Sequence, residues 1–545
     1  AGLTQTYQGK YAQDNYNLNE ITNDLIVSLS HDFNENFKIY GDIGHNFRQR
    51  LLTQSNTQTN EQGGLAIDDY YNLENSNGPA VDYNRLYLRR LIGVYADANV
   101  AIKNMVFIGV TGRNDWSSTL PSNKRSFFYP SANASFVMSE LFKQEFKNKY
   151  ISYAKLRASA AQVGNDAGPY LEKTLYEKGD LSGLSWGSTT LPFNGINGYS
   201  VANLIGNPDI KPEITTGLEA GLEMNFFKDR IGFDFAVYKQ SSKDQIITLP
   251  LPASTGYTGK TINAGVIENK GVELMLRGTP LLTADWKLDL IVTYTKNISD
   301  VISLSEGVDQ ITLGGFANLG IVAAPGHPYG TFYGQDYKRD PQGNVVVDPA
   351  TGLPILSTTS VYFGSYNPDF QASIRANLVY KGLTFGILFD GKKGGQFYSN
   401  TRSLMSFVGT SAETAEGGRD PRVWENSVVE TSPGVFVPNT TPYSPYDLNA
   451  NQANRAVSMN LVDASYIKLR EVSLSYRLPA KWFDKTPLGA VAVGLFGNNL
   501  LLFTPKENKY ADPEINASGN GNAQGFEYTS IPSQRNFGFN IKVNF

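Results

Sequence analysis

The sequence contains no cysteine among its 545 residues, which excludes disulfides and thiolate metal sites. Histidine is nearly absent as well: His31, His45 and His327 are scattered, and ordinary satisfied or solvent-facing side chains explain them better than a metal site. No apolar run is long enough for a transmembrane helix, which leaves membrane proteins built of strands open. The net charge of −4 and the isoelectric point of 5.7 offer no basic surface for a nucleic acid.

Two neighbouring segments, 217–226 and 231–238, alternate between apolar and polar or small residues, which indicates an antiparallel strand pair joined by a short polar turn. One face of the first strand is wholly apolar and consists of Leu218, Ala220, Leu222, Met224 and Phe226. Each run extends over roughly ten residues, the length that a tilted strand needs to cross a bilayer. A charge on the lipid side costs about 2–4 kcal/mol at mid-membrane, so Glu219, Glu223 and Asp234 are expected to face the lumen of a barrel.

The same alternation recurs along the chain, and its connections are of two kinds. Further strands are expected near residues 25–29, 39–43, 86–101, 105–112, 127–138, 151–163, 271–279, 286–295, 370–380, 383–390, 466–478 and 489–498. Long loops are expected at 50–85, 164–212, 241–266, 298–366, 391–464 and 501–533, and residues 1–20 have no assignment. Short turns that alternate with long loops predict an all-β fold, a transmembrane antiparallel β-barrel with short periplasmic turns and long extracellular loops. The aromatic content of 12% fits interfacial girdles, although a tyrosine-rich soluble β protein would share it.

Two strands carry further information. In 466–478 the apolar residues change parity between Leu469 and Val472, which predicts either a bulge near Glu471 or a first half above the membrane. The last strand alternates with apolar residues at Phe537, Phe539, Ile541, Val543 and Phe545. A terminal amphipathic strand that ends on Phe resembles the sorting signal read by the barrel-assembly machinery, so these five residues are predicted to form that signal.

A series of short segments from about residue 86 onward carries a family resemblance. The segments are Gly112-Arg-Asn-Asp-Trp-Ser-Ser-Thr-Leu-Pro121, Tyr129-Pro-Ser-Ala-Asn-Ala-Ser135, Lys155-Leu-Arg-Ala-Ser159, Gly164-Asn-Asp166, Asn207-Pro-Asp-Ile-Lys-Pro-Glu213, Asn269-Lys-Gly-Val-Glu-Leu274, Tyr366-Asn-Pro-Asp-Phe370, Tyr466-Ile-Lys-Leu-Arg-Glu-Val-Ser-Leu-Ser-Tyr-Arg-Leu-Pro479, Asn498-Asn-Leu500 and Asp512-Pro-Glu514. Each is weak alone. Together and in this order they resemble the SusC/RagA family of TonB-dependent outer-membrane transporters from Bacteroidetes.

The resemblance implies a plugged barrel of 22 strands in the outer membrane, in contact with membrane lipid and lipopolysaccharide. It also implies a SusD-like surface lipoprotein that lids the barrel and energy supplied by TonB. Substrates in the family are oligosaccharides or peptides too large for passive pores, and no enzymatic activity is expected. No cofactor is expected either, and Ca²⁺ on an extracellular loop or on the partner is the one alternative.

One departure from the family pattern concerns the start of the chain. The family's N-terminal plug and TonB box are not recognisable here, and the pattern gives only about fifteen or sixteen strands. An unclosed sheet would also leave unpaired backbone in lipid. Residues 1–545 are therefore expected to be the C-terminal barrel portion of a longer protein, whose plug and TonB box are not in this chain.

Three motifs suggest other chemistry and are rejected. Gly183-Leu-Ser-Trp-Gly187 matches a nucleophile elbow but lies in a Gly/Ser-rich loop with no helix after it, and only one histidine follows. Gly259-Lys-Thr261 echoes the end of a phosphate-binding loop, but Ser254 stands at the leading glycine position. The segment Asp336–Asp348 has acidic spacing that could suit Ca²⁺, but its Asp-Pro and Gly-Asn steps indicate turns.

Aromatic residues in the expected loops are the candidate contacts for a substrate or for the lid protein, because sugar rings present apolar C–H faces. They are Trp116, Trp186, Trp424, Tyr443 and Tyr446. For any single one, packing within its own loop is the simpler interpretation. Import of an oligosaccharide or peptide is the leading functional hypothesis. The alternatives are a structural, assembly or secretion-complex component that reuses this barrel, and an outer-membrane hydrolase, which the missing Ser/His constellation disfavours.

Overall fold

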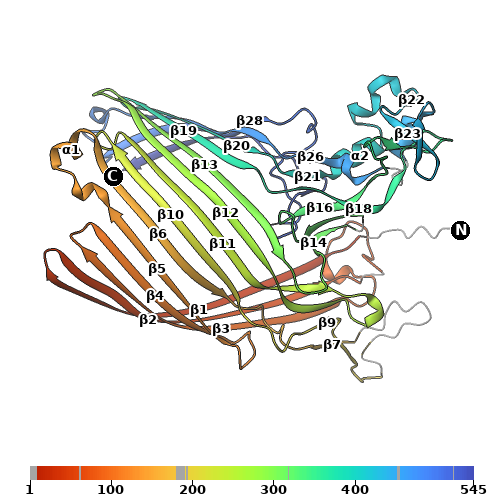
Figure 1. Cartoon of the computed structure of the whole chain (residues 1–545), viewed down its shortest axis with the longest axis horizontal. Helices are drawn as coiled ribbons and strands as arrows, with labels where there is room; N and C mark the ends of the chain where they lie inside the picture. The colour runs from red at the N-terminus through yellow and green to blue at the C-terminus, as the bar shows by residue number, and fades with distance from the viewer. Residues whose placement is uncertain are drawn as a thin grey trace. The chain divides into compact units, whose positions relative to one another are not determined.

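The computed structural model describes residues 9–60, 63–179, 191, 194–316, 318–450, 455–519 and 521–544. Its main feature is one sheet of 16 strands (Figure 1). Fifteen of them follow one another as β1 (Ala12–Asn34), β2 (Phe37–Gln58), β3 (Val81–Ile102), β4 (Val106–Ser117), β5 (Ser126–Val137), β6 (Ile151–Asn165), β10 (Glu213–Phe226), β11 (Ile231–Pro250), β12 (Gly259–Leu282), β13 (Trp286–Ser303), β19 (Phe370–Tyr380), β20 (Leu383–Lys393), β27 (Tyr466–Arg477), β28 (Ala490–Phe503) and β30 (Asn536–Asn544). The sixteenth, β9 (Leu204–Ile205), pairs with β12 in parallel.

The chain divides into two compact units. Unit 1 comprises Ala1–Ala134, Ser159–Thr216 and Ser242–Ala264, and unit 2 comprises Ser135–Ala158, Gly217–Ser241 and Gly265–Phe545. Within each unit, strands that follow one another along the chain pair antiparallel, as β1 does with β2 and β19 with β20. The fifteen strands on the main path coincide with those that the sequence predicts. Alternation with a period of two arises when the two faces of a strand meet different environments, so it identifies these strands directly.

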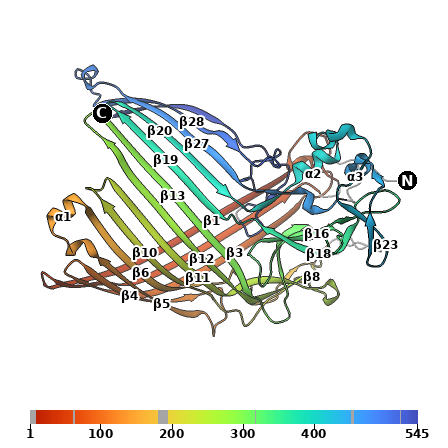
Figure 2. The same cartoon turned by 45° about the horizontal axis from the view of Figure 1, so that its top comes forward.

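Short turns close the strand pairs at one end, as expected. The turn between β3 and β4 is an example, where Lys103 and Asn104 have φ of 49° and 51°. Positive φ at both central residues gives a turn whose twist matches that of the flanking strands. Figures 1 and 2 show β13, β19 and β20 of unit 2 lying side by side with these turns at the same end.

The strands are longer than the sequence predicts, which corrects three assignments. Residues 12–20, left unassigned, pair with 50–58, which were expected to be loop. Much of the expected loop at 241–266 is also strand, since β11 ends at Pro250 and β12 begins at Gly259. The extensions at 12–20 and 50–58 are rich in Asn, Gln and Thr, and those at 241–250 and 259–266 mix polar and apolar residues, so none carries a regular apolar alternation. A backbone ladder needs only N–H and C=O groups, so polar segments can extend a strand without that signal.

The long connections also hold more structure than expected. Within 298–366, 391–464 and 501–533 lie short sheets formed by β14 (Ile311–Phe316), β15 (Leu319–Ala323), β16 (Thr331–Tyr337) and β18 (Leu356–Ser365), by β17 (Val345–Val346), β23 (Ser427–Ser432) and β24 (Val435–Pro438), by β21 (Gln396–Ser399), β26 (Leu461–Asp463) and β29 (Phe526–Glu527), and by β22 (Arg422–Val423) and β25 (Pro442–Tyr443). Residues 164–212 contain β7 (Tyr176–Lys178), β8 (Tyr199–Val201) and β9. The prediction that these segments are loops without secondary structure is therefore wrong.

Helices are few and short. The α-helices are α1 (Gln144–Lys149), α2 (Asn400–Phe407) and α3 (Pro445–Ala450), and the 3₁₀ turns are η1 (Leu73–Asn75), η2 (Met138–Leu141), η3 (Ala253–Thr255), η4 (Ala412–Arg419), η6 (Val457–Asn460) and η7 (Ala480–Trp482). Among the described residues, none of these helices has the length and apolarity to cross a membrane.

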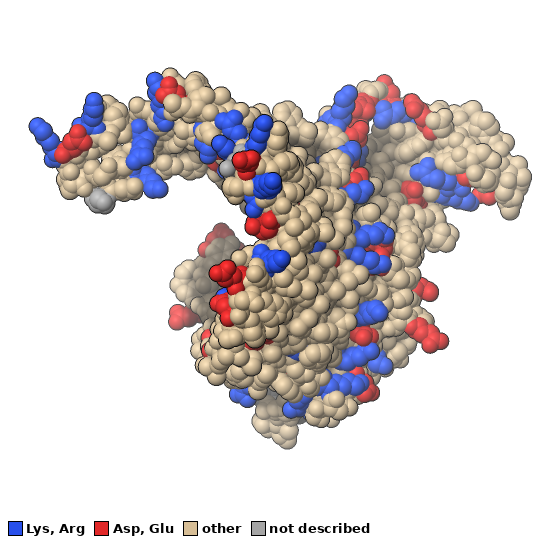
Figure 3. Space-filling model, turned by 60° about the vertical axis from the view of Figure 1, so that its left-hand side comes forward, with Lys and Arg blue, Asp and Glu red and all other residues tan. Residues whose placement is uncertain are grey.

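Apolar side chains of the long strands point outward, whereas the buried core belongs to the connections. Leu25 in β1 is 64% exposed and Phe539 in β30 is 75% exposed, while Phe332 of β16 is fully buried. In unit 2 the buried cluster consists of Leu319, Ile321, Phe332, Val457 and Phe526. A sheet with a bare apolar face is stable in lipid rather than in water. The charged residues visible in Figure 3 are interspersed, acidic beside basic.

The opposite face of the β10–β11 strand pair carries the charges that the sequence assigns to the lumen. Arg157 Nη1 lies 2.8 Å from Asp234 Oδ1, and its Nε lies 3.5 Å from Glu219 Oε1. Glu223 similarly meets Arg277 at 3.5 Å. These acids therefore lie among cations on the face away from the exposed Leu218.

Of the two interpretations of the parity change in 466–478, the bulge is confirmed. The register of β27 against β28 skips Arg470, which is left without a partner between Leu469 and Glu471. The register against β20 skips the same residue. The bulge turns Val472, and every second residue after it, onto the face that Leu469 occupies.

The terminal strand has the predicted alternation. Phe537, Phe539 and Ile541 are exposed on one face of β30, which pairs with β28, and Val543 shares their parity. Phe545 lies outside the described residues. The assembly-signal role of these five residues stays a prediction.

Candidate functional site

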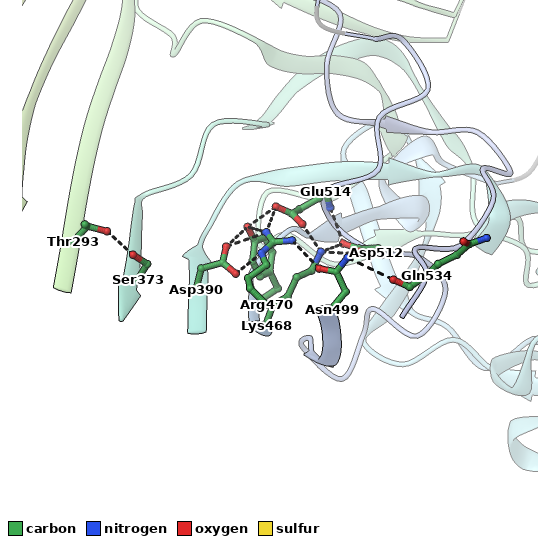
Figure 4. A network of polar contacts seen from close by, with 10 residues as sticks. Thr293, Ser373, Asp390, Lys468, Arg470, Asn499, Asp512, Glu514 and Gln534 are labelled. Atoms are coloured by element: carbon green, nitrogen blue, oxygen red, sulfur yellow. Dashed lines mark hydrogen bonds and ion pairs between the residues drawn. The ribbon is translucent and has the colours of Figure 1, made fainter. Parts of the chain in front are cut away.

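The clearest polar site of unit 2 lies where β20, β27 and β28 give way to their long connections (Figure 4). Lys468 donates from Nζ to Asp512 Oδ1 and Oδ2 at 2.7 and 2.6 Å, and it also bonds Glu514. Arg470 donates to both oxygens of Asp390 at 2.5 and 2.9 Å, and it too bonds Glu514. The ion pairs thus bind the connection after β28 to two neighbouring strands.

Arg470 joins the same network from the bulge. Residues 468 and 470 would share a face even in a regular strand, and the bulge leaves Arg470 without a ladder partner on β20 and on β28. Tyr466 adds a third group, because its hydroxyl lies 2.8 Å from Glu514 Oε1 and 3.2 Å from Asp390 Oδ2. We call these six residues the Lys468–Arg470 anchor: Asp390, Tyr466, Lys468, Arg470, Asp512 and Glu514.

The electrostatics of this anchor are those of a partly buried cluster in which two cations are shared among three carboxylates. The side chains of Lys468 and Asp512 are each 4% exposed. Burial opposes ionisation of Glu514, but hydrogen bonds from Arg470, Lys468 and Tyr466 outweigh it and lower the pKa of Glu514 to about 2. Glu514 is therefore ionised at neutral pH. Buried charges of this kind are tolerated only while each keeps its partners.

Unit 1 has a simpler counterpart, centred on one carboxylate directly after β6. Asp166, whose side chain is 1% exposed, accepts from Arg89 Nε at 3.0 Å and from Thr119 Oγ1 at 3.0 Å. Arg89 Nη2 and Ser117 Oγ also donate to it. Arg89 lies within β3 and Ser117 ends β4, so the Asp166 carboxylate, directly after β6, links three strands. We call Arg89, Ser117, Thr119 and Asp166 the Asp166 anchor.

Next to the Asp166 anchor lies a second buried carboxylate of unit 1. Asp115 accepts from Arg113 Nε at 2.8 Å and from the Tyr129 hydroxyl at 2.6 Å. The segment Asn207–Glu213 packs nearby, with Ile210 buried against Leu120 and Phe127. Both anchors therefore consist largely of segments on which the family resemblance rests.

The anchors hold structure in place and offer no evident covalent chemistry. Within the described part of the chain there is no group of three or more His, Cys, Asp or Glu residues arranged to hold a metal. In Asp336–Asp348, Asp340 Oδ1 accepts from the backbone N–H of Gln342 and Asn344 at 2.9 and 2.7 Å, as the turn interpretation expects. The prediction about cofactors stays untested.

Of the predicted aromatic contacts that the structure describes, Trp424 and Tyr443 are in ring contact. Trp424 and Tyr443 pack within their own connection, with ring centroids 5.3 Å apart, and Trp424 also meets Tyr337 edge-on at 5.6 Å. Burial raises the pKa of Tyr337 to about 12. Tyr446 is exposed on α3. For Trp424 and Tyr443 the geometry favours packing within the loop, while a contact role for Tyr446 stays a prediction.

The two remaining tryptophans differ from these three. Trp116 was expected in a loop but lies in β4, opposite Ile92 and on the exposed apolar face with Ile108 and Val110. Near a strand end, that position suits an aromatic residue at the membrane interface. Trp186 lies outside the described residues. Their roles as substrate or lid contacts also stay predictions.

Sequence reasoning missed the residues of both anchors. One signal was present: Lys468 and Arg470 are cations beside the parity change of strand 466–478, and Asp512-Pro-Glu514 carries two carboxylates within three residues. Alternation alone gives no partner for these charges, because the acids lie 44 or more positions further along the chain.

A sheet with an outward apolar face and anchored connections at one end defines a transmembrane β-strand protein. The family comparison makes this specific: the model described as "TonB dependent receptor-like, beta-barrel" matches residues 1–500, and the chain belongs to that family. The family places it in the outer membrane as a multi-pass β-barrel, which confirms the predicted fold class and location.

Relatives and solved structures agree with the resemblance to SusC and RagA. The chain is 29% identical to "TonB-dependent receptor P26" of Formosa agariphila, over 96% of this chain and 53% of that protein. It is 25% identical to "TonB-dependent receptor SusC" of Bacteroides thetaiotaomicron, over 38% of this chain and 24% of that protein. The solved RagAB peptide transporter superposes with a TM-score of 0.77 at 19% identity, over 98% of this chain and 56% of that one. The chain thus spans about half the length of these longer matches, and whether it is a C-terminal portion stays a prediction.

Proposed function

We propose that the complete protein imports an oligosaccharide or a peptide across the outer membrane with energy from TonB. Membership of the TonB-dependent receptor family carries this proposal, and the fold shared with a peptide transporter supports it. The same relatives suggest a SusD-like lipoprotein that covers the connections of this chain as a lid on the barrel.

Transport of this kind is a conformational process rather than a covalent one. A lid opens above the barrel and a plug is displaced below it, while the barrel wall and its connections keep their positions. The two anchors suit a fixed wall with a moving lid and plug, because each holds a long connection against neighbouring strands through a buried ion pair. The substrate would then meet a preformed surface, which lowers the entropy lost on binding.

The test is a deletion strain complemented with either the full-length gene or the same gene carrying a disabled TonB box. Uptake of labelled oligosaccharides and oligopeptides is measured in parallel, so one experiment separates the two substrate classes. The proposal expects uptake of one class to be lost on deletion, restored by the intact gene and not by the altered one. Equal uptake in all strains would refute it.

A purification from the same strains tests the lid. The tagged full-length protein, extracted in mild detergent, should co-purify with one lipoprotein in a fixed ratio. If the deletion instead abolishes the surface display of other proteins and leaves uptake intact, the protein is an assembly or secretion component.

A further inference from the structure

Arg455 is a buried arginine of unit 2 whose guanidinium is only partly hydrogen-bonded. It is 8% exposed and lies beside η6, which packs against α2, β16 and β26 (Figure 1). Its Nη1 donates to the backbone carbonyl of Ser403 in α2 at 3.1 Å, and its Nη2 lies 3.4 Å from Asn460 Oδ1 in η6. Its buried Nε has no acceptor among the described residues. Most N–H groups of this side chain are therefore unused by the described part of the chain.

Two other arginines show what normally fills the open side of such a guanidinium. Nε–H and one Nη2–H point the same way and form a fork that matches the two oxygens of a carboxylate. Arg48 holds Glu20 in this fork, at 3.0 Å from each nitrogen. Arg402 holds Glu413 with the same two nitrogens, at 3.2 and 3.0 Å. In Arg455 the fork is open at Nε and meets only an amide oxygen at Nη2.

Carboxylates near Arg455 already have other partners. Glu413 belongs to Arg402, as described above. Glu527, beside the start of α2, accepts four hydrogen bonds of 2.7–3.0 Å from hydroxyl and backbone N–H groups, so both of its oxygens are occupied. The segment 451–454, which precedes Arg455 in the sequence, reads Asn-Gln-Ala-Asn and has no acidic residue.

The buried charge of Arg455 is therefore poorly compensated. Burial of the guanidinium lowers the pKa of Arg455, as expected for a cation that lacks an adjacent acid. A water molecule at Nε would complete the hydrogen bond but would leave the charge without a counterion, which is costly inside a protein. An anion in the fork meets both needs at once.

We propose that the open fork of Arg455 binds a small carboxylate anion from solution. One oxygen of the anion accepts from Nε and the other from Nη2, as the carboxylate of Glu20 does on Arg48. The anion neutralises the buried charge and holds Arg455 between α2 and η6. Its binding therefore stabilises the connection 391–464, in which both elements lie.

The shape and charge of the fork determine the class of ligand. A carboxylate offers one oxygen to each of the two N–H groups, whereas a halide offers a single centre to both. Phosphate carries more negative charge than one guanidinium compensates, and the excess is costly in a buried site. Because Arg455 is almost fully buried, the ligand is small, of the size of formate or acetate.

Titrations with formate and acetate, followed by saturation-transfer NMR, measure binding to the full-length protein in detergent micelles. Phosphate and chloride are titrated in parallel. Arg455→Lys keeps the charge but removes the fork, and Asn460→Asp sets a carboxylate of the chain beside the fork. In both variants the dissociation constant of formate should rise by about tenfold or more, the factor that corresponds to about 1.4 kcal/mol.

Matched controls make the same changes at exposed positions of the same connection. Arg419→Lys replaces an exposed arginine, and Asn426→Asp adds a carboxylate on an exposed side chain. Both controls should bind formate as the wild type does.

Hydrogen exchange separates a filled fork from a damaged fold. With formate at about ten times its dissociation constant, exchange in α2 and η6 of the wild type should slow by about tenfold relative to chloride at the same ionic strength. In Asn460→Asp these elements should already be protected without formate, and formate should add nothing.

Four results would overturn the inference: no saturable binding of formate or acetate by the wild type, equal losses in the controls, equal protection by chloride, or binding of phosphate alone. Because the readouts are anion binding and hydrogen exchange rather than uptake, any of these results would leave the proposed transport function unaffected.

Discussion

Both anchors hold a long connection against neighbouring strands, but they use different chemical groups to do so. The Asp166 anchor uses one carboxylate to collect an arginine and two hydroxyls, whereas the Lys468–Arg470 anchor interlaces two cations, three carboxylates and a tyrosine. In the first, three donors depend on one acceptor. In the second, two cations are shared among three carboxylates, and loss of one cation leaves a buried acid with its full desolvation cost. The comparison suggests two ways in which such a site is weakened. Loss of a shared acceptor leaves several donors without a partner, and loss of one cation leaves a buried acid without one.

The largest effect is expected at Lys468. Lys468→Met leaves Asp512 buried without its cation, so the free energy of unfolding should fall by about 3–5 kcal/mol. The thermal midpoint in detergent and the rate of proteinase K cleavage in the connection 504–535 measure this. Lys481→Met, on an exposed side chain, is the control. An unchanged midpoint in Lys468→Met would show that this anchor contributes no stability.

The Asp166 anchor should respond less. Asp166→Asn keeps the shape but removes the charge to which Arg89 and two hydroxyls donate, and about 1.5–3 kcal/mol of stability should be lost. Asp209→Asn is the matched control, because Asp209 is an exposed carboxylate 3.2 Å from Lys124, and surface pairs contribute about 0–1 kcal/mol. If both substitutions cost the same, burial is not what gives the anchor its strength.

Acid should distinguish the anchors further. The folded pKa of Glu514 is about 2 and its ordinary value is 4.5, so its contribution is complete above pH 4.5 and is lost as the pH falls towards 2. Hydrogen exchange of the connection 504–535 should therefore accelerate, relative to its intrinsic rate, between pH 4.5 and 2. In Glu514→Gln the connection should already be less protected at pH 6, and the same acid step should shrink. A step of equal size in both proteins would assign it to another group.

The smallest effect is expected for an ion pair outside the anchors. Arg277 and Glu223 lie 3.5 Å apart and are both partly exposed. Arg277→Gln should change the free energy of unfolding by no more than about 1 kcal/mol, since exposed pairs gain little. The same thermal scan measures it. A loss as large as that of Lys468→Met would remove the distinction between anchors and ordinary strand pairs.

The sequence by itself determined the strands. A strand with one face in lipid must alternate apolar with polar or small residues, because a charged residue on the lipid face is costly. The β10–β11 pair and the terminal strand follow from that rule. The parity change near Glu471 was visible as well, but only the register of β27 showed that a bulge causes it. Alternation gave no information where the rule does not apply, so the extensions of β1, β2, β11 and β12 were unassigned or assigned to loops. The short sheets within the connections were missed for the same reason.

Only the tertiary structure decided which charges meet. Lys468 and Asp512 are 44 positions apart, and Arg89 and Asp166 are 77 apart. Their pairing depends on the order of strands in the sheet and on where the connections after β6 and β28 fold back against it. Alternation is a local consequence of the solvent on each side of a strand, whereas contacts between distant charges exist only once the sheet has formed.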